Sequence, residues 1–252
     1  MQSSNPVLTR LDDVSAAERT VLTERGADRM SIDAVVIRTV ALLLLTGAAG
    51  AIAWVTLRAD GVTGLALFGS SIAGLVLGLV IAFKRITNPW LIAAYAIVQG
   101  VLLGVVSRAF EQVYPGIVIQ AVVGTFGVFA GMAVLYKFRV LRATPRFTRF
   151  VIGALIGVVV LSLANYLVYL FTGNQGLEVY DPNAEVGWVP IVFAIVCIGV
   201  GALTFILDFD AIEQGIRYGL PEKYAWYCAF GLLVGLIFLY WQILRLLSYL
   251  RR

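Results

Sequence analysis

Seven long apolar blocks, separated by shorter polar connections, run along the chain. They cover Val35–Leu57, Val62–Phe83, Pro89–Ser107, Gly116–Tyr136, Phe150–Thr172, Trp188–Leu207 and Ala225–Leu247. Each holds about 20 residues, the length that an α-helix needs to cross the hydrocarbon core of a bilayer. Backbone groups inside lipid must form their hydrogen bonds within the chain, so each block predicts a transmembrane helix. We therefore expect an all-α polytopic membrane protein in which residues 34–252 form a bundle of seven transmembrane helices.

Residues 1–33, before the first block, are polar and carry four arginines and six acidic residues. A segment with so few apolar residues cannot bury enough surface to fold, so we expect a poorly ordered N-terminal tail. The rest of the chain is too apolar for a soluble domain, because 60% of all 252 residues are hydrophobic and only 13% are charged. The lipid bilayer is therefore the first predicted partner.

The net charge of +4 does not predict nucleic acid as a partner, because most of the basic residues lie outside the apolar blocks and not in one patch. The clearest connection is 137–149, which holds five basic residues and no acid. Fourteen of the nineteen basic residues fall on the side of the N-terminus. Under the positive-inside rule, this places the N-terminus in the cytoplasm of a multi-pass cell-membrane protein. A re-entrant last segment is the alternative that would return Arg251 and Arg252 to the cytoplasm.

Several kinds of chemistry are excluded by residues that the chain lacks. It contains no histidine, which removes His-ligated haem, HExxH zinc sites and His-dependent proteolysis. No lysine lies inside a predicted span, so a retinal Schiff base is also excluded. The two cysteines, Cys197 and Cys228, lie in predicted helices and are interpreted as apolar packing residues. We expect no enzymatic activity and no cofactor.

Three carboxylates follow the sixth block: Asp208, Asp210 and Glu213. On a helix, Asp208 and Asp210 lie about 200° apart, whereas Asp210 and Glu213 differ by about 60°. Asp208 is best placed to face the bundle, where it could exchange protons or bind a cation such as Ca²⁺ transiently. A solvated helix end is the alternative interpretation of Asp210 and Glu213.

A fourth candidate for ion or proton sensing, Glu111, lies between the third and fourth blocks. Arg108 precedes it by three residues, so a local ion pair is the alternative interpretation. An intramembrane aspartyl protease would need aspartates on two facing helices, and Asp208 and Asp210 share one helix. Proteolysis is therefore not expected.

Glycine pairs spaced four apart occur in five of the seven blocks, at Gly74/Gly78, Gly100/Gly104, Gly127/Gly131, Gly153/Gly157 and Gly231/Gly235. Such pairs let two helix backbones approach closely in lipid. They predict a tightly packed bundle.

Several of these features occur in an order that is typical of one family. They are the basic connection after the fourth block, Asp208 followed by Ile212, and the run Tyr224-Ala225-Trp226-Tyr227-Cys228, together with the stretch from Gly104 through Glu111 and Pro115 to Gly127. Over about residues 30–250 the chain resembles the Bax inhibitor/YccA family, also called the TMBIM group. The tail, which contains Ser4-Asn5-Pro6 near its start, and the segment from Asp210 to Tyr227 resemble its actinobacterial-type branch.

The resemblance implies a slow, pH-sensitive calcium leak, in which aspartates on the sixth and seventh helices share a proton and hold the pore closed. Asp208 matches the first aspartate. The second falls at Val234 or at a neighbour such as Gly231 or Gly235, and no carboxylate lies in Ala225–Leu247. A single aspartate lacks the coupling of a pair, so we expect a shallower pH response and a weaker hold on Ca²⁺.

The expected function is therefore cation leak or transport, calcium by resemblance, with Asp208 as the foremost residue. The alternative is a membrane interaction protein that modulates a membrane protease or stress-response complex, as resemblance to the YccA branch implies. Deleting the tail separates the two functions, because cation flux would survive and partner regulation would not.

Overall fold

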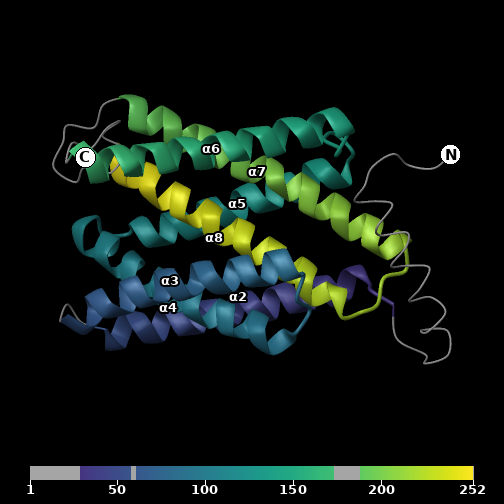
Figure 1. Cartoon of the computed structure of the whole chain (residues 1–252), viewed down its shortest axis with the longest axis horizontal. Helices are drawn as coiled ribbons and strands as arrows, with labels where there is room; N and C mark the ends of the chain where they lie inside the picture. The colour runs from purple at the N-terminus through teal and green to yellow at the C-terminus, as the bar shows by residue number, and fades with distance from the viewer. Residues whose placement is uncertain (1–28, 58–60, 173–187, 252) are drawn as a thin grey trace. The chain divides into compact units, whose positions relative to one another are not determined.

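The computed structural model describes residues 29–57, 61–172 and 188–251, and these residues form seven long α-helices (Figure 1). The helices are α2 (Ile32–Thr56), α3 (Gly61–Lys84), α4 (Pro89–Val113), α5 (Ile117–Lys137), α6 (Pro145–Thr172), α7 (Trp188–Arg217) and α8 (Tyr224–Leu250). Apart from one isolated bridge, the described residues form no β-structure. The predicted all-α architecture is confirmed. Residues 1–28 of the predicted tail lie outside the described residues.

All seven helices are long and apolar enough to cross a membrane. Large apolar side chains cover their outer faces, including Phe68 at 75% exposure and Trp90 at 82%. A water-soluble protein would bury such side chains, whereas lipid solvates them. The chain is therefore a multi-pass integral membrane protein, as its seven apolar blocks predict.

Two helices extend well beyond the predicted spans. α7 does not end near Leu207 but continues without a break to Arg217, and α4 continues beyond Ser107 to Val113. Asp208, Asp210 and Glu213 consequently lie within a helix and not at its end. Glu111 lies in the last turn of α4 and not in a connection.

The helices are grouped into two compact units. Unit 1 comprises Met1–Gly104 and Asp210–Leu233, and unit 2 comprises Val105–Phe209 and Val234–Arg252. Unit 1 thus contains α2, α3, most of α4 and the adjoining ends of α7 and α8. Unit 2 contains α5, α6 and the remainder of α4, α7 and α8.

In unit 1, α2 and α4 pack with their backbones in contact. A Cβ atom added to Gly104 would lie 2.2 Å from the backbone oxygen of Gly50, and one added to Gly100 would lie 2.4 Å from that of Thr46. Only glycine on α4 permits this approach, in which Cα–H groups and carbonyls take the place of side-chain packing. α3 also packs against α4, with Gly78 next to the ring of Tyr95.

In unit 2, α6, α7 and α8 share one apolar cluster. Val158 of α6 lies in it with Cys197 and Val200 of α7, and Phe238 of α8 packs against these three. Cys197 is buried in this cluster, as its interpretation as an apolar packing residue predicts, and Cys228 is partly buried. α8 is the most deeply packed span, with 50% of its most apolar stretch buried against 11% for α6.

The glycine pairs serve different purposes in different helices. Gly100/Gly104 and Gly74/Gly78 form close helix contacts, as predicted. By contrast, a Cβ atom at Gly127 or Gly131 of α5 would have no described atom within 4 Å, and the same is true of Gly153 and Gly157 of α6. For these two pairs the predicted packing within the bundle is wrong.

Candidate functional site

One face of α7 is a continuous buried stripe that contains a single carboxylate. The stripe repeats every three or four residues, which keeps its members on one side of the helix. Its members are Pro190, Ala194, Cys197, Gly201, Phe205, Asp208, Ile212 and Gly215. All of them are buried except Asp208, which is half-buried. The inward direction predicted for Asp208 therefore agrees with the burial of its neighbours one and two turns away.

Asp208 makes no hydrogen bond and no ion pair with any other residue that the structure describes. The same is true of the buried Oε1 atom of Gln242 on α8. An ionisable group in a membrane span is costly unless it is paired or reached by water or an ion. Asp208 is therefore half-buried and has no partner among the described residues, so its carboxylate is available to bind a proton or a cation.

The other two acids of α7 are satisfied locally. The side-chain amide of Gln214 donates to Oδ2 of Asp210 at 2.5 Å, and the guanidinium of Arg217 donates to Oε1 of Glu213 at 2.5 Å. Both contacts join residues four apart on one helix face. These contacts favour local surface roles for Asp210 and Glu213.

Glu111 closes the turn between α4 and α5. Its Oε1 atom accepts from the backbone N–H of Gly116 at 2.5 Å, and its Oε2 atom accepts from Val118 at 3.1 Å. Gly116 has a φ of +81°, a conformation that glycine adopts without strain, and it immediately precedes α5. The carboxylate thus binds N–H groups at the start of a helix, where a negative charge is favourable. This geometry favours a structural role for Glu111.

The described residues do not gather the four acids into a metal site, because no group of three potential ligands lies close enough to hold an ion. Asp208 and Glu111 belong to unit 2, and Asp210 and Glu213 belong to unit 1. Ca²⁺ prefers six to eight oxygen ligands. The arrangement therefore does not provide a tight calcium site among these residues.

The packing of α8 shows why a carboxylate would not fit easily at Gly235, one of the positions considered for the second aspartate. A Cβ atom on Gly235 would lie 2.8 Å from the ring of Phe205, one turn before Asp208. A Cβ atom on Gly201 would lie 2.9 Å from the ring of Phe238. The helices are thus in contact through glycine and aromatic rings. An aspartate at Gly235 would require Phe205 to move.

The rings next to Asp208 form a cluster of their own. Phe209 lies 5.7 Å from Phe129 and 5.6 Å from Tyr136 of α5, measured between ring centroids, and 6.3 Å from Phe205. Such contacts fix the side chains of α7 on either side of Asp208 in the sequence. They hold this part of α7 against α5.

The sequence as a whole matches the model of one protein family, described as Bax inhibitor 1 like, over residues 5–252. The chain belongs to the Bax inhibitor 1 like family. This result confirms the family resemblance and leaves the branch within the family a prediction. No curated protein matches the chain.

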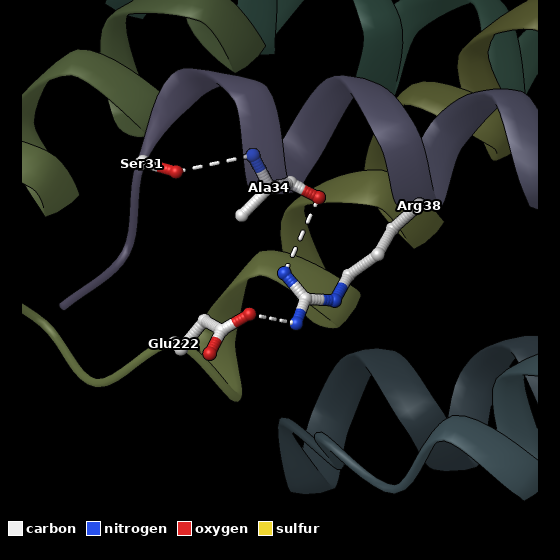
Figure 2. Close-up of polar contacts among 4 residues, drawn as sticks. All are labelled: Ser31, Ala34, Arg38 and Glu222. Atoms are coloured by element: carbon white, nitrogen blue, oxygen red, sulfur yellow. Dashed lines mark hydrogen bonds and ion pairs between the residues drawn. The ribbon is translucent and has the colours of Figure 1, made fainter. Parts of the chain in front are cut away.

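A further polar contact of this Bax inhibitor 1 like chain was missed by sequence reasoning. Arg38 on α2 forms an ion pair with Glu222, which precedes α8 (Figure 2). Its guanidinium also donates to the carbonyl of Ala34 at 3.2 Å and lies 5.3 Å from the ring centroid of Trp226. The sequence contained one signal for this ion pair, because Arg38 lies inside the first apolar block and a charge in a membrane span needs a partner.

The residues just before α2 are held at the same place. Met30 is buried, and its backbone N–H donates to the carbonyl of Leu220 at 2.8 Å. Arg29 forms the isolated bridge with Pro221. Ser31 caps α2 by accepting from the N–H of Ala34 (Figure 2). The start of the first span is thereby fixed to the α7–α8 connection.

Arg38→Gln is expected to destabilise the protein more than Arg217→Gln does. The Arg38 side chain is 17% exposed and touches Trp226, whereas that of Arg217 is 68% exposed. A double-mutant cycle of Arg38→Gln with Glu222→Gln should give a coupling of about 1 kcal/mol, against about 0.3–0.5 kcal/mol for Arg217 with Glu213. Thermal unfolding in detergent, followed by size-exclusion chromatography, measures both. Equal couplings would contradict a larger stabilising contribution from the Arg38–Glu222 ion pair.

Proposed function

We propose that this protein is a non-enzymatic cation leak of the cell membrane and that Asp208 is the residue through which cations or protons act. The observation that carries the proposal is a half-buried carboxylate on the buried face of a membrane-spanning helix, with no partner among the described residues. Ionisable residues inside membrane spans mark ion and proton routes more often than they serve packing. No other acid of α7 has this combination of properties.

The proposed leak passes ions without holding them tightly. Asp208 supplies one carboxylate, and no group of three potential ligands lies among the described residues, so the oxygens available are far fewer than in a calcium-binding loop. Conduction requires binding that is favourable enough for entry and weak enough for release. Calcium is the proposed ion by family resemblance. The single carboxylate favours a modest preference for it over other cations.

The proposed orientation places the N-terminus in the cytoplasm. The excess of basic residues on that side supports it. α8 runs unbroken over Tyr224–Leu250, a length of about 40 Å at 1.5 Å per residue. This exceeds the thickness of the hydrocarbon core and favours a full crossing over a re-entrant segment. The C-terminus would then lie outside.

Asp208→Asn should lower calcium flux and abolish its dependence on pH. Asparagine keeps the size of the side chain but cannot lose a proton or carry a negative charge, so it neither attracts a cation nor titrates. The measurement is dye-reported Ca²⁺ flux into proteoliposomes at intervals from pH 6 to pH 8. Wild-type flux should change across this range, while flux through the variant should stay constant and lower.

Asp210→Asn and Glu213→Gln serve as matched comparisons, because each also removes one carboxylate from α7. Both should keep the pH-dependent flux of the wild type, since their side chains are engaged with Gln214 and Arg217. Wild-type flux equal to that of protein-free liposomes would refute the leak. Loss of pH dependence in all three variants would refute the assignment to Asp208.

A further inference from the structure

The connection between α5 and α6 presents five cationic side chains on one exposed surface. These are Lys137, Arg139, Arg142, Arg146 and Arg149, and all five are exposed. They fall within thirteen residues that contain no acid. None of the five side chains makes a hydrogen bond, ion pair or cation–π contact with another residue in the part of the chain that the structure describes. This group is called the basic connection below.

The backbone of the basic connection is folded tightly and therefore holds these charges in place. Arg139, two residues after the end of α5, has a φ of +62° and donates its N–H to the carbonyl of Tyr136, while the N–H of Val140 donates to the carbonyl of Leu135. This pattern satisfies the last carbonyls of the helix. On the other side, the hydroxyl of Thr144 accepts from the N–H of Phe147 and caps α6.

Apolar side chains are interleaved with the charges. Phe138 is 71% exposed, Val140 66% and Phe150 64%. α5 and α6 both qualify as membrane spans, so the segment that joins them must lie where hydrocarbon meets water. At that depth, apolar side chains enter the acyl region while long basic side chains reach the headgroups.

We infer that the basic connection is a binding surface for the headgroups of anionic phospholipids. Five unpaired cations with no neighbouring acid complement a phosphate-bearing surface, and clusters of four to eight Lys and Arg next to a span attract anionic lipids. The exposed Phe138 and Val140 favour lipid over a soluble anion, because water would not solvate them. The surface would hold a ring of anionic lipid against the ends of α5 and α6. This inference does not depend on the proposed cation leak.

The test compares two spin-labelled lipids next to the full-length protein in phosphatidylcholine vesicles. Electron paramagnetic resonance gives the fraction of labelled phosphatidylglycerol, or of labelled phosphatidylcholine, that the protein immobilises. Wild type should select phosphatidylglycerol, and 0.5 M NaCl should weaken the selection because salt screens charges at this distance. In the triple variant Arg139→Gln, Arg142→Gln, Arg146→Gln, the association constant of phosphatidylglycerol relative to phosphatidylcholine should fall toward one, the value without selection, since each basic residue near an anionic surface contributes separately.

Two further variants keep the test decisive. Arg10→Gln, Arg19→Gln, Arg25→Gln changes the net charge equally but leaves the basic connection intact, so it should retain wild-type selection. Substituting lysine at Arg139, Arg142 and Arg146 keeps the charge and should also retain it. Equal immobilisation of both lipids by wild type, or an equal loss in the tail variant, would overturn the inference. So would complete competition by 10 mM inorganic phosphate at constant ionic strength, because the surface would then bind a soluble anion.

Discussion

Gly104→Ala is expected to reduce the stability of the protein severely, although it adds only one methyl group. The added carbon would lie 2.2 Å from the backbone oxygen of Gly50 and 2.9 Å from its Cα atom. A flexible side chain could turn away from such a contact, but the backbone of α2 cannot move without separating the two helices. Overpacked cores usually lose about 1–3 kcal/mol, and a clash with backbone should reach or exceed the upper end of that range. Thermal unfolding in detergent, followed by the monomer peak on size-exclusion chromatography, measures the loss.

Gly131→Ala is the matched control, because it makes the same chemical change in another Gly-xxx-Gly pair. No described atom lies within 4 Å of the added carbon, and alanine favours a helix over glycine by up to about 1 kcal/mol. The control should therefore be neutral or slightly stabilising. If both variants lost the same stability, the close approach of α2 and α4 would not be the reason.

The second large effect is expected at the buried hydrogen bond between Ser107 of α4 and Tyr240 of α8. The two hydroxyl oxygens lie 2.6 Å apart, and both residues are buried. Ser107→Ala leaves the phenolic hydroxyl without this partner, which should cost about 1–3 kcal/mol. Tyr240→Phe should cost less, because a helical serine can turn its hydroxyl to the carbonyl of the preceding turn.

The double variant Ser107→Ala, Tyr240→Phe distinguishes this account from a simple loss of packing. Removing both hydroxyls leaves neither side of this contact with a buried polar group that has lost its partner, so the double variant should be more stable than Ser107→Ala alone. Hydrogen bonds between membrane helices couple by about 0.6 kcal/mol on average and by up to about 1.7 kcal/mol. Strictly additive losses in chemical or thermal unfolding would contradict the prediction.

The seven spans could be predicted from the sequence because the requirement is local. A run of about 20 apolar residues must form its own hydrogen bonds in lipid, whatever surrounds it. The residue at which a helix ends depends less on the local sequence. α7 continues through Asp208, Asp210 and Glu213 because acidic residues are compatible with a helical backbone, so the end of an apolar block does not mark the end of a helix.

The inward direction of Asp208 followed from helical periodicity, but the roles of other residues did not. For Glu111, a candidate for ion or proton sensing, the alternative interpretation was an ion pair with Arg108, whereas its hydrogen bonds come from Gly116 and Val118 across a turn that the sequence did not define. The partner of Arg38 lies 184 residues away, and only the fold brings the two together. The glycine pairs carry identical patterns, yet which of them face another helix depends on tertiary packing.

The anchoring of Arg29 and Met30 determines where this chain can be shortened. Composition places the end of the tail at residue 33, but the methyl group of Met30 lies 2.8 Å from the position of a Cβ on Gly215, and its backbone is bonded to Leu220. A truncation or protease site designed at residue 33 would therefore remove part of the folded domain and uncover the end of α7. Expression variants, fusion proteins and tail-deleted variants should therefore keep Arg29 and every residue after it. A loss of function on deleting the tail then reports on the tail and not on a damaged helix junction.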